Sequence, residues 1–176
     1  MDAYITIANC QSLIEEVLDA LSDNPYIENT WIHTTKNYAK KSKETNRQRY
    51  QNILDNLMGI LNHAEKVGDE YFVIINRDIV HPQIAIPTMH NFLSDNPKYG
   101  AVGYNTKIIS RPDKGMKHVG TGFMMIRTAA VKNFTLNLTD KHACCCVTFV
   151  EQFYQHQWKV DYVGYDRNGV PLKFLR

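Results

Sequence analysis

The chain has 176 residues, of which 44% are hydrophobic and 22% are charged, so it is long enough for one globular domain with a substantial core. A net charge of +2 argues against nucleic-acid binding over a wide basic surface, and no apolar run approaches the roughly 18 residues of a membrane helix. The first residues, MDAYITIANC, lack the basic region and cleavage site of a signal peptide. The four cysteines, Cys10 and Cys144 to Cys146, have no CxxC spacing, which predicts free thiols in a reducing cytoplasm and no zinc site.

The first third of the chain predicts a strand, a helix and a second strand. Residues 3–8 are rich in β-branched side chains and predict a strand. Ser12 and Glu15 form a capping-box pattern, after which an apolar stripe predicts a helix that ends near residues 23–25. Residues 29–35 predict the second strand, and the basic stretch 36–47 predicts a loop.

The rest of the chain continues the alternation of helices and strands. Thr45 and Gln48 form another capping box, and the stripe from Tyr50 to Ala64 predicts a long helix that stops near Gly68. Later elements are predicted as strands at 70–76, 100–105, 120–127 and 158–163, and helices at 87–93, with Pro87 in an early turn, and 141–156. This order predicts one α/β domain with a mostly parallel sheet covered on both faces.

Polar residues stand where three of the predicted strands end. These clusters are Ala8-Asn9, Thr34-Thr35 and Asn76-Arg77-Asp78. Since ligands of such sheets bind beyond the carboxyl ends of the strands, we expect the clusters to meet at one edge. Asp78 follows a buried strand, a position that suits Mg²⁺ or Mn²⁺ together with a diphosphate; it could instead only start the turn before Pro82. Arg77 could bind the same diphosphate or pair with Asp78.

The stretch DNLMGILNHAEKVGDEYFVIINRDIVHP resembles the segment that leads to the D-x-D motif of GT-A glycosyltransferases of the family-2-like, nucleotide-sugar type. The chain start, AYITIANCQSLIEEVLDAL, is similar to the first nucleotide-binding βα unit of these enzymes, and YGAVG and HVGTGFMMIRTAAVKNF resemble their next two strands. The resemblance covers most of residues 3–163. It implies a single GT-A-like α/β/α domain over residues 1–176, with a nucleotide-sugar-binding part (3–110) and an acceptor-side part (111–176).

The resemblance also implies the roles of particular residues. Donor contacts would come from Ala8, Asn9, Thr34, Asp55, Asn56, Asn76 and Arg77, and acceptor contacts from Gly120, Thr121 and Gly122. The ligands of Mn²⁺ or Mg²⁺ would be Asp78, Asn76 and His142. The expected activity is the transfer of a sugar from a nucleotide-diphosphate donor to a hydroxyl of a sugar, lipid-linked or protein acceptor, with no nucleic-acid partner and no integral membrane segment.

The sequence departs from the family pattern at three places. Asn76 replaces the first Asp of D-x-D, Thr34 and Thr35 stand where an Asp is common, and the usual acidic pair before the late helix falls near Cys145-Cys146. Asp140 is the nearest acid, which makes it the candidate catalytic base if the transfer inverts the anomeric centre; an ordinary helix N-cap is the competing interpretation. Two alternative functions remain open: a non-catalytic nucleotide-sugar-binding protein of the same fold, and a nucleotidyltransferase, for which IANCQS lacks the usual Gly-rich basic loop.

Overall fold

A single sheet forms the centre of the part of the chain that the computed structural model describes, which is residues 1–8, 15–35, 43–76, 82–104, 121–138 and 145–164. Within these residues the strands are β1 (Asp2–Ala8), β2 (Asn29–Thr35), β3 (Tyr71–Asn76), β4 (Tyr99–Tyr104), β5 (Phe123–Arg127) and β6 (Lys159–Val163). The helices are α1 (Glu15–Ser22), α2 (Lys43–Val67), α3 (Pro82–Asp95) and α4 (Cys145–Gln155), with a short 3-10 helix, η2 (Thr128–Ala130).

The strand order across the sheet is β2-β1-β3-β5-β4-β6. β1 pairs in parallel with β2 and β3, and β4 pairs in parallel with β6, whereas β5 runs antiparallel to both of its neighbours. The mostly parallel sheet predicted from the sequence is therefore confirmed. Because β5 is reversed, its first residue lies at the edge where the other strands end.

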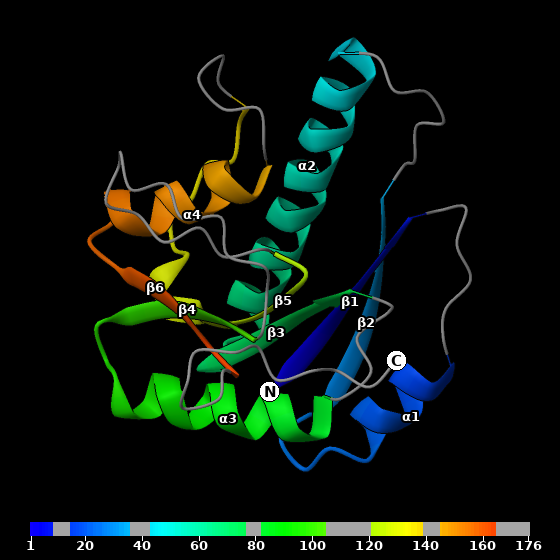
Figure 1. Ribbon diagram of the computed structural model, residues 1–176, viewed down its shortest axis with the longest axis vertical. Helices are drawn as coiled ribbons and strands as arrows, with labels where there is room; N and C mark the ends of the chain where they lie inside the picture. The colour runs from blue at the N-terminus through cyan, green and yellow to red at the C-terminus, as the bar shows by residue number, and fades with distance from the viewer. Residues whose placement is uncertain (9–14, 36–42, 77–81, 105–120, 139–144, 165–176) are drawn as a thin grey trace.

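Helices cover both faces of the sheet, with α2 and α4 on one face and α1 and α3 on the other (Figure 1). β3 shows why this arrangement is stable, since its residues alternate between two hydrophobic cores. Phe72 and Ile74 pack with Leu54 of α2, while Val73 and Ile75 pack on the α1 and α3 side. A strand buried on both faces produces the unbroken apolar run of the sequence.

Helix α2 begins earlier than the sequence pattern predicts. It starts at Lys43, so Thr45 is its third residue and the predicted Thr45–Gln48 capping box is wrong. The side chain of Gln48 instead donates a hydrogen bond to Oδ1 of Asn52, one turn further along the helix, at 3.2 Å. Lys43 and Glu44 are good helix formers, which explains why the helix extends into the predicted loop.

Helix α3 is twice as long as predicted, and Pro87 lies inside it rather than in an early turn. The proline removes the hydrogen bond to the carbonyl of Gln83, which stands on the exposed first turn where water can take its place. Ala85, Ile86 and Met89 of this helix are buried against the sheet. Apolar packing therefore maintains the helix across a residue that usually interrupts one.

Other predicted elements agree with the structure within a few residues. β2 has the predicted bounds, and β1, β3, β4 and β6 each differ from theirs by a residue. Ser12 of the first capping box and residues 141–144 of the last predicted helix lie outside the described residues. The predicted strand 120–127 is shorter, because Thr121 and Gly122 form a turn ahead of β5. No helix in the described ranges combines the length and apolar character needed to span a membrane.

Candidate functional site

The carboxyl ends of β1, β2 and β3 lie side by side at one edge of the sheet. The register pairs Ala8 with Thr35 and Thr6 with Asn76, so three predicted polar clusters meet there through their described members. The reversed strand β5 adds Thr121 and Gly122 to the same edge. This is the position at which open α/β sheets bind their ligands.

Asn76 is fixed at this edge by contacts from two neighbouring strands. Its backbone N–H donates a hydrogen bond to the carbonyl of Gly122 at 2.7 Å, and its side-chain Oδ1 accepts one from the hydroxyl of Thr6, also at 2.7 Å. A Cβ placed on Gly122 would lie 2.9 Å from Nδ2 of Asn76, which is closer than an ordinary contact. Glycine at position 122 therefore leaves the space that the Asn76 amide occupies. We call Thr6, Asn76 and Gly122 the edge triad.

The edge triad presents neutral polar groups to solvent. Asn76 is exposed, and its Nδ2 carries two N–H donors that can bind oxygen atoms of a ligand. Its Oδ1 already accepts a hydrogen bond from Thr6, so one lone pair remains for a cation or a second donor. The triad can thus bind a hydroxyl or phosphate oxygen, and can add one oxygen to a metal site.

Helix α2 borders the same edge with a row of amide side chains. Its first turns extend past the sheet (Figure 1), and Asn52 and Asn56 lie one turn apart on the flank that faces β2. Among the described residues, the Nδ2 atoms of both residues are buried and have no hydrogen-bond partner. A buried donor left without a partner costs about 1–3 kcal/mol, so both atoms favour an acceptor such as water or a ligand oxygen.

His33 of β2 contacts this row through a hydrogen bond with the side chain of Asn56. Burial lowers the pKa of His33, the hydrogen bond to Asn56 acts in the opposite direction, and the nearby His63 lowers the pKa further. His33 is consequently neutral near pH 7 and can offer either a donor or an acceptor nitrogen.

Two predicted donor-site residues take other positions. Asp55 is exposed and accepts a hydrogen bond from Nε2 of Gln51 at 2.8 Å, so it is directed away from the contact that Asn56 makes with His33. Thr34 is exposed and follows His33 in the strand, which puts its side chain on the opposite face of the sheet. The structure therefore places Asn56 beside the edge triad's face of the sheet, and separates Asp55 and Thr34 from it.

The first turn of α4 approaches the edge triad beside the turn that precedes β5. The hydroxyl of Thr121 lies 3.5 Å from the sulfur of Cys146. Cys145 is buried and Cys146 is half-buried, and both are free thiols, as predicted. Cys145 belongs to the buried hydrophobic cluster together with Phe149, and Cys146 packs against the same cluster. The place where the sequence resemblance implies an acidic pair thus holds two thiols.

The large buried side chain of Tyr4 stabilises the strand that carries Thr6. Tyr4 of β1 lies two residues before Thr6 on the same face, with its ring against Phe72 and its hydroxyl 2.9 Å from Nδ1 of His63. Burial and the charges of Asp2 and Asp69 raise the pKa of Tyr4 well above 10, so its hydroxyl stays protonated. This rigid packing fixes the end of β1 from which Thr6 projects.

Six predicted site residues lie outside the described residues: Asn9, Arg77, Asp78, Gly120, Asp140 and His142. In the described ranges, no three His, Cys, Asp or Glu side chains come close enough together to hold a metal ion. Asn76 is the described member of the predicted metal set and offers one oxygen of suitable chemistry. The metal site remains a prediction that depends mainly on Asp78.

Sequence reasoning missed Thr6, His33 and Asn52. The alternation of β1 contained the signal for Thr6, because Thr6 and Ala8 share a face of the strand. The four-residue spacing of Asn52 and Asn56 contained the signal for Asn52, since residues i and i+4 are neighbours on a helix. His33 could not be distinguished from the other histidines until the pairing of β2 with β1 was known.

The sequence matches no family model and no curated protein, and the comparisons that succeed are with solved structures. Glucosyl-3-phosphoglycerate synthase from Mycobacterium tuberculosis, in complex with Mn²⁺ and UDP-glucose, aligns over 99% of this chain and 71% of its own, with a TM-score of 0.60 and 11% identity. A CMP:2-keto-3-deoxy-manno-octonic acid synthetase complexed with CTP aligns over 92% of this chain and 88% of its own, with a TM-score of 0.55 and 11% identity.

A third similar structure is a cytidylyltransferase from Leptospira borgpetersenii, which aligns over 96% of this chain and 77% of its own, with a TM-score of 0.58 and 12% identity. At these identities the comparisons establish the fold. The chain has the GT-A-like α/β/α fold of these nucleotide-using enzymes, and the resemblance predicted from the sequence is confirmed at that level.

Proposed function

We propose that this chain is a glycosyltransferase that moves a sugar from a nucleotide-diphosphate donor to an acceptor hydroxyl. The observation that carries the proposal is the edge triad at the carboxyl edge of a GT-A-like sheet: Thr6 donates to the side-chain oxygen of Asn76, and the carbonyl of Gly122 accepts from its backbone N–H. The three similar structures named above carry UDP-glucose, CTP or the name cytidylyltransferase. We therefore infer a pyrimidine nucleotide as the donor's leaving group.

The proposed donor contacts surround the edge triad. Asn76 would donate from Nδ2 to an oxygen of the donor, and Asn56 with His33 would border the nucleoside along the flank of α2. The sequence resemblance keeps five further residues in the proposed donor set: Ala8, Asn9, Thr34, Asp55 and Arg77. Asp55 and Thr34 do not share the face of the sheet on which the edge triad lies, so they would have to contact the donor from the edge of the sheet. The division of the chain at residue 110 also remains a prediction.

The acceptor would approach from the side of β5 and α4. Gly120, Thr121 and Gly122 would line its path, and the hydroxyl of Thr121 is in hydrogen-bonding contact with the thiol of Cys146 at 3.5 Å. Asp140 would take the proton of the acceptor hydroxyl as the new C–O bond forms. Turnover by an Asp140→Asn variant at a normal rate would remove it from this role.

A divalent ion would be held by Asp78 with an oxygen of Asn76 and with His142. When bound, Mn²⁺ or Mg²⁺ supplies charge neutralisation for the departing nucleoside diphosphate. The protein's own contribution at this point is the fixed position of Asn76, which does not depend on metal because Thr6 and Gly122 hold it.

A nucleotidyltransferase is the second candidate. Two of the similar structures favour it, a CMP:2-keto-3-deoxy-manno-octonic acid synthetase complexed with CTP and a cytidylyltransferase, which align over 88% and 77% of their own lengths. A binding protein without turnover is the third, supported by the thiols at the place of the acidic pair.

A two-stage assay tests the proposal and separates the candidates. Thermal shift with UDP, UDP-glucose, CTP, GDP and ADP, each with and without Mn²⁺, should show stabilisation by a pyrimidine nucleotide, because a ligand that binds the folded state raises the melting point. Slow release of UDP from the bound donor indicates a glycosyltransferase, pyrophosphate release from CTP with a sugar acid indicates a nucleotidyltransferase, and binding without either indicates a binding protein. Stabilisation by no nucleotide would overturn the proposal.

A further inference from the structure

Strand β2 forms one edge of the sheet, and within the described residues nothing pairs with its outer side (Figure 1). Its sequence, NTWIHTT, contains no charged residue, no proline and no glycine. Thr30, Ile32, Thr34 and Thr35 are β-branched, and Trp31 is aromatic, so the strand consists largely of residues that favour pairing. An edge of this kind is open to a further strand.

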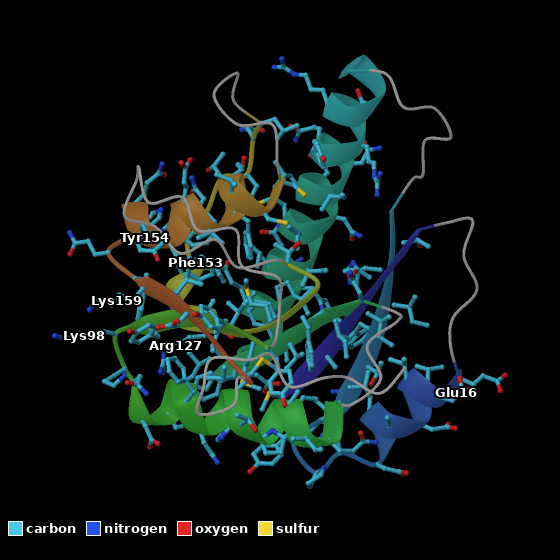
Figure 2. All side chains as sticks on the ribbon, in the orientation of Figure 1. Glu16, Lys98, Arg127, Phe153, Tyr154 and Lys159 are labelled. Atoms are coloured by element: carbon cyan, nitrogen blue, oxygen red, sulfur yellow. The ribbon has the colours of Figure 1, made fainter. Side chains whose placement is uncertain are left out.

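The opposite edge of the sheet, formed by β6, carries charged side chains that hinder the addition of a further strand. β6 begins with the exposed Lys159 and contains Asp161. Figure 2 shows Lys159 at the side of the molecule opposite to Glu16 of α1. Charged side chains on an edge strand are a common means of preventing strand addition. This chain therefore protects one edge of its sheet with charge and leaves the other without it.

Exposed apolar side chains gather at the unprotected edge. Four large hydrophobic residues are exposed among the described residues, and two of them, Trp31 (40%) and Ile32 (50%), belong to β2. A third, Val67, stands one helical turn beyond His63, whose ring lies 4.5 Å from that of Trp31. Trp31 and Ile32 point to opposite faces of the sheet, so apolar surface flanks the edge on both sides.

We propose that β2 pairs antiparallel with β2 of a second copy of this chain, about a two-fold axis at Ile32. In this register Ile32 lies opposite the partner's Ile32, Trp31 opposite the partner's His33, and Thr30 opposite the partner's Thr34. One face of the junction then matches aromatic rings, and the other matches β-branched side chains, which are favourable cross-strand pairs. The strand is thus complementary to itself, as a two-fold interface requires.

The charge that directly precedes β2 fits the same register. The carboxylate of Glu28 is exposed and lies 3.4 Å from the amino group of Met1. A parallel pairing would bring the Glu28 carboxylates of the two copies together, whereas an antiparallel pairing keeps them at opposite ends of the junction. The result would be one continuous sheet through two copies, joined at a distance from β4 and β6.

The test is the oligomeric state of matched lysine variants. Sedimentation velocity of the wild type should show a reversible dimer, with a dissociation constant in the micromolar range because the interface is small. Ile32→Lys should shift that constant by at least tenfold toward monomer, since two like charges would face each other at the axis. Ile84→Lys, at an isoleucine on α3 that is even more exposed (64%), should leave the dimer unchanged.

A covalent trap tests the register independently of stability. Two cysteines directly opposite across an antiparallel pair lie within disulfide range. Ile32→Cys should therefore form an intermolecular disulfide between the two introduced thiols under mild oxidation, and Ile84→Cys should not. A wild type that stays monomeric at high micromolar concentration, an Ile84→Lys variant that dissociates as readily as Ile32→Lys, or cross-linking at both positions would each overturn the proposal.

Discussion

Replacing Gly122 with alanine should weaken nucleotide binding while the fold persists. The new Cβ would stand 2.9 Å from Nδ2 and 3.5 Å from Cγ of Asn76, whereas ordinary contacts begin near 3.4 Å. The Asn76 amide must therefore move by about 0.5 Å, which is the difference between 3.4 and 2.9 Å. Such a move displaces Oδ1 from its 2.7 Å hydrogen bond with Thr6.

The two energetic consequences of Gly122→Ala nearly cancel in stability. Loss of the Thr6–Asn76 hydrogen bond costs about 0.5–1.5 kcal/mol. Alanine restricts the unfolded chain more than glycine and returns about 0.4–1 kcal/mol. The net change is at most about 1 kcal/mol, or a melting point lower by roughly 2–4 °C for a domain of this size. A folded variant can therefore be compared directly with the wild type in binding.

Isothermal titration with UDP supplies the comparison. If Asn76 contacts the nucleotide, losing one hydrogen bond of about 1–1.4 kcal/mol should raise Kd about fivefold to tenfold. Gly59→Ala is the matched control, because a Cβ on Gly59 meets nothing within 4 Å. That helical change should stabilise the protein by about 0.5–1 kcal/mol and leave Kd unchanged. Equal Kd values for Gly122→Ala and the wild type would refute the assignment of the edge triad to the nucleotide.

Three further predictions concern the scaffold. Gly100→Ala should lower stability by about 1–3 kcal/mol in a urea titration, because its Cβ would lie 2.7 Å from Cβ of Ala130 in a packed layer; an unchanged midpoint would contradict that packing. Arg127→Lys should lower the free energy of unfolding by about 1–2 kcal/mol in the same titration. The guanidinium of Arg127 donates to the carbonyl of Leu93 at 2.7 Å and also bonds the carboxylate of Glu70 and the carbonyl of Tyr99, and an ammonium group cannot replace all of these bonds. An unchanged midpoint would show that these bonds are dispensable. Burial lowers the pKa of His33 below 6.5, so at falling pH this histidine takes up a proton in the unfolded chain before it does so in the folded protein. The contribution of neutral His33 to stability is therefore complete above about pH 6.5 and declines as the pH falls. The melting point should consequently fall less between about pH 7 and pH 5.5 in His33→Gln than in the wild type, and equal falls would contradict the shift.

The sheet was predictable from the sequence because a strand that is buried on both faces has an unbroken run of apolar residues. The residues of β3 alternate between two cores, which demands an apolar side chain at every position and marks the strand clearly. β2 was recognisable from its β-branched residues alone, and its bounds agree with the prediction. The reversal of β5 was not predictable, because the direction of a strand depends on the connections around it.

Helix boundaries were less accessible for a physical reason. A proline usually ends or begins a helix. In α3, however, the burial of Ala85, Ile86 and Met89 outweighs the backbone hydrogen bond that Pro87 cannot donate. Thr45 has the chemistry of an N-cap, but nothing in its own sequence window excludes two more helical residues before it. Packing decided the first case and local helix propensity the second.

The candidate site was predictable as an edge but not as a set of contacts. Strand order brought Ala8 and Asn76 to one edge, as their positions at strand ends implied, and the reversal of β5 added Gly122 to that edge. The hydrogen bond from Thr6 to Asn76 joins residues 70 positions apart, and such a pair has no local signal. The register of β2 was needed to know which of its side chains point to the face of the triad, and it places Thr34 on the opposite face.

The measurement that most directly tests the central claim is a ¹⁵N NMR titration of the wild-type protein with UDP-glucose in the presence of Mg²⁺. We expect saturable shift changes concentrated at the amides of Thr6, Asn76, Gly122 and Asn56, with the amides of α3 near Leu93 unchanged. Shifts that gather elsewhere on the molecule, or the absence of saturable binding of UDP-glucose and CTP alike, would contradict the proposed site.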